Sequence, residues 1–196
     1  MQAQIPSQTL SGGFAEPAIA SAAAFRQVME AMARPGTIHM VTGAAPPAPL
    51  SPATGAVLLT LCDPDTPVHL AGELDCEAVR AWIAFHTGAP VSGPSRCMFA
   101  VGGWSDLMPL GAYQIGTPQY PDRSATLIVQ VGRLEPDGAV LSGPGIKDTH
   151  ALSLPDIEAF QRNAGHFPLG LDFIFTCCDQ VAALPRSTVV TQKGDI

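Results

Sequence analysis

The chain has 196 residues, of which 46% are hydrophobic and only 14% charged, and its formal net charge is −7. The length fits one domain, and because no basic run or basic helix face occurs, the composition argues against direct recognition of nucleic acid. The low charge content leaves two explanations open. Either a partner protein covers part of the surface, or the many small alanines lower the charged fraction without any partner.

The first elements along the chain are two helices separated by a strand and a loop. Residues 21–36 predict a helix that Ser21 caps and that Pro35-Gly36 ends. Its apolar side chains recur three and four residues apart, at Phe25, Val28, Met29 and Met32. A strand is expected at 37–42, and a proline-rich loop follows it. Ser51 and Pro52 then open a helix at 53–63, which is apolar nearly all round and is therefore expected at the centre.

The middle of the chain reads as short strands around a third helix. Strands are expected at 67–71 and 96–103, with a helix at 75–89 between them and a short helix at 104–111. The unbroken apolar run at 124–134 is the strongest strand pattern in the chain. Such a run indicates burial on both faces of a sheet.

Toward the C-terminus the predicted strands come close enough to form hairpins. Residues 139–146 are expected to pair with the strand at 124–134 across a short polar turn. A helix at 154–168 precedes strand-like segments at 170–177 and 180–190. Helices and strands that alternate early and pair later predict an α/β fold, a three-layer α/β/α sandwich whose mixed sheet is covered on both sides.

The run Gly143-Pro144-Gly145 allows two interpretations. It has neither the spacing nor the Gly-Lys-Ser/Thr ending of a P-loop, and it lacks the third glycine of a dinucleotide-binding fingerprint. Proline followed by glycine is typical of a type II turn, which requires a positive φ at the glycine. We therefore favour a turn, with an anion site on the amides of Gly143 and Gly145 as the alternative.

Three further side chains have both a structural and a functional interpretation. Arg34 follows the first predicted helix and His86 ends the third, where a cation or a capping side chain stabilises a helix without any ligand. Arg186 follows a predicted buried strand, where the helix dipole gives no such explanation. It is expected either to pair with a carboxylate or to bind a ligand or a second subunit.

Lysine is scarce in this sequence, and this bears on cofactor chemistry. Covalent pyridoxal phosphate (PLP) catalysis needs a lysine, and only Lys147 and Lys193 exist, the latter near the end of the chain. The sequence has no G-x-S-x-G elbow, no H-E-x-x-H and no C-x-x-C spacing, so no catalytic constellation and no metal site is predicted.

The cysteines and the N-terminus bear on the compartment. An odd number of cysteines with one vicinal pair argues against a disulfide framework, so all are expected to be small buried residues in a reducing compartment. They are Cys62, Cys76, Cys97, Cys177 and Cys178. The first ten residues lack the pattern of a signal peptide, and the longest apolar run is too short to span a bilayer. A soluble, cytoplasmic protein is expected.

Several blocks of the sequence, taken together, resemble the PhnH family, subunits of the bacterial carbon–phosphorus lyase core complex. The blocks are F-R-Q-V-M-E-A-M-A-R-P-G-T, W-I-A-F-H-T-G-A-P, Y-P-D-R-S-A-T-L-I-V-Q-V, L-S-G-P-G-I, N-A-G-H-F-P-L-G-L-D-F-I-F and A-L-P-R-S-T-V-V, in that order. The likeness divides the chain into a flexible arm at 1–13, one domain at 14–190 and a flexible tail at 191–196. Ser187, where the family often has threonine, is a small departure.

The resemblance implies a fold similar to PLP-dependent transferases but without a PLP site, so no cofactor is expected. It also implies a homodimer that assembles with the PhnG, PhnI and PhnJ subunits, with no nucleic acid and no membrane partner. The complex displaces adenine from ATP with a phosphonate to give a ribose 1-phosphonate 5-triphosphate. No catalytic residue is known to carry across.

Three functional hypotheses follow. The first is a subunit of that transferase complex whose role is structural, or structural and allosteric, and which is inactive alone. The second is a nucleotide- or phosphonate-binding module within the complex. The candidate ligand-binding residues of the second are Arg34, Arg123, Gly143, Gly145 and Arg186. The third, a remote one, is a stand-alone PLP enzyme that depends on Lys147.

Overall fold

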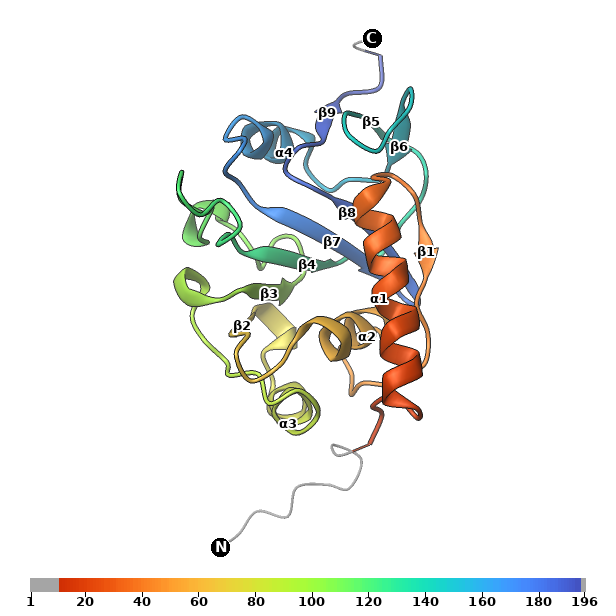
Figure 1. Ribbon diagram of the computed structural model, residues 1–196, viewed down its shortest axis with the longest axis vertical. Coiled ribbons are helices and arrows are strands. Elements are labelled where there is room, and N and C mark those ends of the chain that lie inside the picture. The colour runs from red at the N-terminus through yellow and green to blue at the C-terminus, as the bar shows by residue number, and fades with distance from the viewer. Residues whose placement is uncertain (1–10, 195–196) are drawn as a thin grey trace, which may run out of the picture.

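A computed structural model describes residues 11–194, which form a six-stranded mixed sheet, a separate three-stranded sheet and four α-helices (Figure 1). The main sheet has the order β1-β8-β7-β4-β3-β2 and comprises β1 (His39–Met40), β2 (Val68–Leu70), β3 (Phe99–Gly102), β4 (Thr126–Gln130), β7 (Asp172–Cys177) and β8 (Gln180–Leu184). The small sheet has the order β6-β5-β9 and comprises β5 (Ala139–Ser142), β6 (His150–Leu152) and β9 (Val189–Thr191). The helices are α1 (Pro17–Ala33), α2 (Pro52–Leu61), α3 (Glu77–His86) and α4 (Ile157–Ala164).

Strand β4 lies at the centre of the main sheet, parallel to β3 on one side and to β7 on the other. Leu127 and Val129 belong to the core on one face and Ile128 to the core on the opposite face, and all three are fully buried. This confirms the expectation of a strand covered on both faces. An unbroken apolar run is needed here because strand side chains point alternately to the two faces.

Different elements cover the two faces of the sheet. Residues of α1, α2 and α3 pack in the core that contains Ile128, whereas α4 and the small sheet contribute to the core that contains Leu127. Figure 1 shows α1 running along the sheet and α4 beside β9. The layers confirm an α/β sandwich with a mixed sheet. They also place β5 and β6 away from the main sheet.

The four longer predicted helices are confirmed in position, with corrections at their boundaries. Helix α2 begins as expected, since the Ser51 side chain accepts a hydrogen bond from the Thr54 amide. Helix α1 begins at Pro17, so Ser21 lies inside the helix and is not its cap. The proline explains the earlier start, because its fixed φ suits the first turn of a helix.

One predicted helix and one predicted strand pairing were wrong. Residues 104–111 form turns and a single 3-10 turn instead of a short helix, since Pro109 cannot donate the hydrogen bond that a continuing helix needs. Strand β5 does not pair with β4, because both edges of β4 are already hydrogen-bonded to β3 and β7. It pairs instead with β9 and with β6, a strand that the sequence did not predict.

The structure also bears on the two ends of the chain and on whether a helix could span a membrane. The predicted flexible arm and tail lie in part outside the described residues, namely 1–10 and 195–196. The carbonyl oxygen of Ser11 accepts a hydrogen bond from the Trp82 indole at 3.0 Å, so the chain contacts α3 just before α1. Within residues 11–194, no helix has the length and apolar character that crossing a bilayer requires.

Candidate functional site

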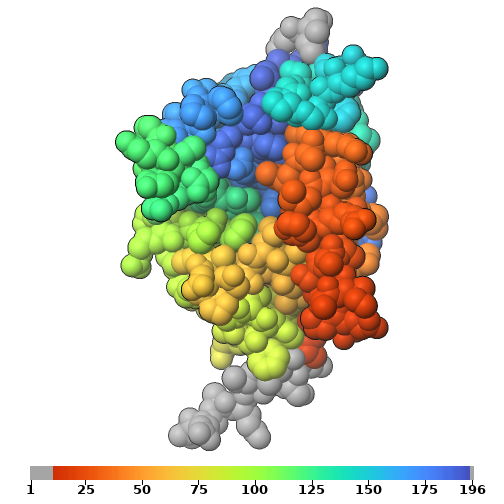
Figure 2. All heavy atoms as spheres, in the orientation of Figure 1, coloured from red at the N-terminus to blue at the C-terminus, as the bar shows by residue number. Residues whose placement is uncertain are grey.

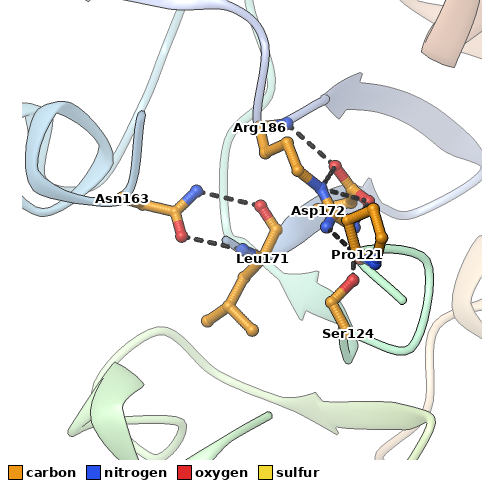
Figure 3. A network of polar contacts seen from close by, with 6 residues as sticks. All are labelled: Pro121, Ser124, Asn163, Leu171, Asp172 and Arg186. Atoms are coloured by element: carbon orange, nitrogen blue, oxygen red, sulfur yellow. Dashed lines mark hydrogen bonds and ion pairs between the residues drawn. The ribbon is translucent and has the colours of Figure 1, made fainter. Parts of the chain in front are cut away.

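Arg186, one of the candidate ligand-binding residues, lies in a network of polar contacts at the end of β8 (Figure 3). Its guanidinium pairs with the Asp172 carboxylate at the start of β7, with Nε 3.2 Å from each carboxylate oxygen. The backbone amide of Arg186 also donates to Asp172, at 2.8 Å. The two side chains are 14% and 18% exposed. Of the two interpretations given above, the structure shows the carboxylate pair.

The same guanidinium holds the loop that precedes β4. Its Nη1 donates to the Pro121 carbonyl oxygen at 2.7 Å, and its Nη2 donates to the Ser124 hydroxyl (Figure 3). Arg123 lies in this loop, exposed, with its guanidinium carbon 4.1 Å from the centre of the Tyr120 ring. Arg186 is therefore a brace for the loop that presents Arg123.

A second pair of hydrogen bonds lies beside this network, at the end of α4. The buried Asn163 side chain donates from Nδ2 to the Leu171 carbonyl oxygen at 2.9 Å and accepts from the Leu171 amide at 2.8 Å (Figure 3). The side chain thus pairs with the backbone as a neighbouring strand would. It fastens α4 to the residue that leads into β7.

The Gly143-Pro144-Gly145 segment is a turn, as the sequence indicated. Gly145 has a φ of 82°, and the Ile146 amide donates to the Gly143 carbonyl oxygen at 3.1 Å, as a type II turn requires. A Cβ on Gly143 would lie 3.2 Å from the Ser187 carbonyl oxygen, and one on Gly145 would meet the Ala33 carbonyl. The turn is therefore packed between the end of α1 and the segment after Arg186.

Arg34 and the residues after it lie at the same junction. The His150 Nδ1 donates to the Pro35 carbonyl oxygen at 2.7 Å, and a Cβ on Gly36 would lie 2.6 Å from the His150 Cβ. Arg34 itself is exposed and pairs with Glu30 at 3.4 Å. Three of the blocks quoted above, R-P-G, G-P-G-I and P-R-S-T, are thus contacts of one packing junction.

The electrostatics of this junction do not favour an anion. Gly145 lies against the Ala33 carbonyl at the C-terminal end of α1, where the helix dipole carries partial negative charge. No described contact joins Arg34 to Arg123 or Arg186, so the structure does not gather the three arginines at one point. Ligand binding by these residues stays a prediction.

A cleft that the sequence did not predict lies at the carboxyl ends of the parallel strands β3 and β4. Its volume is about 700 Å³, and Trp104 and Arg133 belong to its lining. Trp104 packs on Phe160 with 4.8 Å between ring centres, and Arg133 pairs with Glu135 at 3.3 Å. Crevices at this end of α/β sheets are common ligand sites. The signal available in the sequence was the pair of glycine-containing turns after the two strands.

The cysteines range from buried to exposed, with Cys76 and Cys177 half-buried. Cys62 and Cys97 are buried, and burial raises the pKa of their thiols to about 12 and about 11. Burial also raises the pKa of Cys177, and a hydrogen bond that its thiol donates to Cys178 raises it further. Cys178 itself is exposed, with a φ of 53° in the turn between β7 and β8. The expectation that all five are buried was therefore wrong for Cys178 and only partly met by the half-buried Cys76 and Cys177.

Alkylation of the isolated chain with iodoacetamide at pH 8 should modify Cys178 first. Cys97 should react about 100-fold more slowly and Cys62 about 1000-fold more slowly, because only the thiolate is nucleophilic and their raised pKa values keep them protonated. Mass spectrometry of tryptic peptides at successive times measures the order. Fast labelling of Cys62 in folded protein would contradict its burial at the end of α2.

These contacts define an α/β protein in which the polar clusters named above brace loops and helix ends. Within residues 11–194, no three His, Cys, Asp or Glu side chains lie close enough to hold a metal ion. A sequence model of PhnH, described as a bacterial phosphonate metabolism protein, matches residues 12–191. The chain therefore belongs to the PhnH family of bacterial phosphonate metabolism proteins.

Two relatives accord with this assignment. The chain is 42% identical over 198 residues to the alpha-D-ribose 1-methylphosphonate 5-triphosphate synthase subunit PhnH of Rhizobium meliloti strain 1021, covering 95% of this chain and 98% of that protein. It is 29% identical over 181 residues to the putative C–P lyase subunit protein HtxG of Stutzerimonas stutzeri, covering 87% of this chain and 86% of that one.

Proposed function

We propose that the chain is a subunit of a carbon–phosphorus lyase core complex, which displaces adenine from ATP with an alkylphosphonate. The observation that carries the proposal is the 42% identity, over nearly full length, to a relative named as a subunit of the corresponding synthase. In this proposal the chain works in the cytoplasm as a homodimer bound to PhnG, PhnI and PhnJ. Alone it turns over neither ATP nor methylphosphonate.

The outer face of α1 supports a role as a subunit. Ile19, Phe25 and Met29 are 68%, 48% and 50% exposed. Alanines between and beyond them are exposed as well, at Ala22, Ala23 and Ala33. Figure 2 shows α1, in red to orange, as a continuous band on the molecular surface. Two of the residues of the predicted apolar stripe are thus half outside the core, and a run of apolar surface of this kind is typical of contact with another protein.

The test is co-expression of the chain with PhnG, PhnI and PhnJ, followed by purification through a tag on this chain. The wild-type chain should retain the other subunits, and the double variant Phe25→Glu/Met29→Glu should lose them by about tenfold or more, as for two central contact residues. In this proposal, another subunit of the core complex binds the exposed apolar face of α1. Mass spectrometry of the eluate measures the retained amounts.

Phe85→Glu is the matched control, because Phe85 is an apolar residue on α3 that is 58% exposed. This variant should retain the other subunits as the wild type does. Unchanged retention by the double variant would refute the role of α1. Failure of the wild-type chain to retain any subunit, or turnover of ATP and methylphosphonate by the chain alone, would refute the proposed function.

A further inference from the structure

A second cavity, of about 570 Å³, lies between residues 108–115, helix α4 and the start of β7. Its walls are largely apolar, from Met108, Pro109, Leu110, Ile115 and Leu171. Apolar walls with a few polar groups are the usual character of small-molecule sites. None of the residues singled out from the sequence lines this cavity.

Tyr113 is the unusual member of the lining. It exposes only 6% of its surface, and its hydroxyl makes no hydrogen bond within residues 11–194, yet the oxygen is not one of the fully buried atoms there that lack a partner. The hydroxyl oxygen is therefore accessible, belongs to a residue that lines the cavity, and is available to bond a ligand. Burial raises the pKa of Tyr113 to about 12, so the hydroxyl stays protonated and remains a hydrogen-bond donor at neutral pH.

Of the other polar side chains of the lining, Arg162 and His166 can donate hydrogen bonds, and Asn163 is already occupied. Arg162 and His166 lie at the exposed part of the lining, and the Arg162 guanidinium is 3.4 Å from Glu158 in a pair whose side chains are 68% and 82% exposed. Such an exposed pair is weak and leaves the guanidinium available. Both polar atoms of Asn163 bond the Leu171 backbone, so Asn163 shapes the wall.

We propose that this cavity binds a small organic anion, with its hydrocarbon or aromatic body against the apolar walls and its acidic oxygens toward Tyr113, Arg162 and His166. None of the residues that line the cavity has a carboxylate, so its hydrogen-bond donors favour a ligand that accepts hydrogen bonds. The positive Arg162 guanidinium favours a ligand with negative charge. The apolar walls favour a ligand with a hydrocarbon or aromatic part, which an inorganic ion lacks. This site is separate from the packing junction at the end of α1, and its ligand does not depend on the proposed subunit role.

The test is isothermal titration of the full chain with three probes. Phenylphosphonate has both an anionic head and an apolar body, inorganic phosphate has only the head, and benzyl alcohol has only the body. Phenylphosphonate should bind saturably at millimolar concentration or below, and each of the other two should bind at least tenfold more weakly. Phenylacetate tests which head group the site accepts. A site for organic acids in general should bind it, whereas a site specific for phosphonates should not.

Tyr113→Phe removes only the hydroxyl and should weaken phenylphosphonate binding about tenfold, the effect of losing one hydrogen bond to a charged group. Tyr120→Phe is the matched control, because Tyr120 is 51% exposed and does not line the cavity. It should bind as the wild type does. Arg162→Gln, a substitution on the surface that leaves folding intact, should also weaken binding about tenfold and provides the test if Tyr113→Phe fails to fold.

Three results would overturn the inference. One is the absence of saturable phenylphosphonate binding to the wild-type chain. Another is equal binding of benzyl alcohol or of inorganic phosphate. The third is unchanged affinity in both Tyr113→Phe and Arg162→Gln. All of these are measured on the isolated chain, so they are independent of whether the other subunits co-purify.

Discussion

Replacing Gly145 by alanine is expected to lower the free energy of unfolding by about 3 kcal/mol, the combined cost of backbone strain and a steric overlap. Gly145 has a φ of 82°, a region that residues with a Cβ rarely adopt, and the new Cβ would overlap the carbonyl oxygen of Ala33. Because that oxygen belongs to the backbone of α1, no side-chain rotation relieves the overlap. Urea unfolding followed by circular dichroism measures the loss.

Gly93→Ala is the matched control for this substitution. Gly93 is exposed, has a φ of −77°, and no heavy atom lies within 4 Å of a Cβ built there. Its free energy of unfolding should stay within about 0.5 kcal/mol of the wild type, as for most surface substitutions. If Gly145→Ala were as stable as Gly93→Ala, the turn would not be packed against α1.

The second large effect is expected for Arg186→Ala, which should lower the free energy of unfolding by about 3 kcal/mol. The substitution leaves the Asp172 carboxylate, only 18% exposed, without its cation, and it frees the Pro121 carbonyl and the Ser124 hydroxyl. Arg186→Lys keeps the charge but cannot reach the carboxylate and the loop together, because it lacks the planar fork. It should therefore recover only part of the loss.

The exposed pair of Arg80 with Asp75 provides the control for Arg186. Its side chains are 48% and 34% exposed, so Arg80→Ala should remain close to wild-type stability. Equal stability of Arg186→Ala and Arg80→Ala would show that the network does not brace the fold. A stable Arg186→Ala that no longer responds to millimolar ATP in thermal melts would instead support the ligand-binding interpretation of Arg186.

The sequence predicted the elements whose signals are local. Ser51 and Pro52 predict the start of α2, because a capping side chain and a first-turn proline act within three or four residues of the helix start. The turn at Gly143–Gly145 is predictable for the same reason, since its type depends on two adjacent residues. The unbroken apolar run that forms β4 predicted burial on both faces, because its side chains alternate between two covered faces of the sheet.

The candidate site was less predictable, because its partners are distant in the chain. Arg186 suggested a carboxylate pair, but nothing local indicates that the carboxylate is Asp172 or that the loop contacts are Pro121 and Ser124. Tyr113 has no pattern around it in the sequence at all. Its burial results from its place in the core that also contains Leu127, and its ring lies 6.2 Å from that of His69.

By itself, then, the sequence determined the α/β class, the positions of most helices and strands, the glycine turn and the likeness to PhnH. Only the tertiary structure decided that β5 pairs with β6 and β9, that Phe25 and Met29 lie half outside the core, and that the Tyr113 hydroxyl makes no hydrogen bond within residues 11–194. The physical reason is the range of the interactions. Caps, turns and periodicity depend on neighbours in sequence, whereas strand pairing, ion pairs and cavities depend on which surfaces remain uncovered once the whole chain has folded.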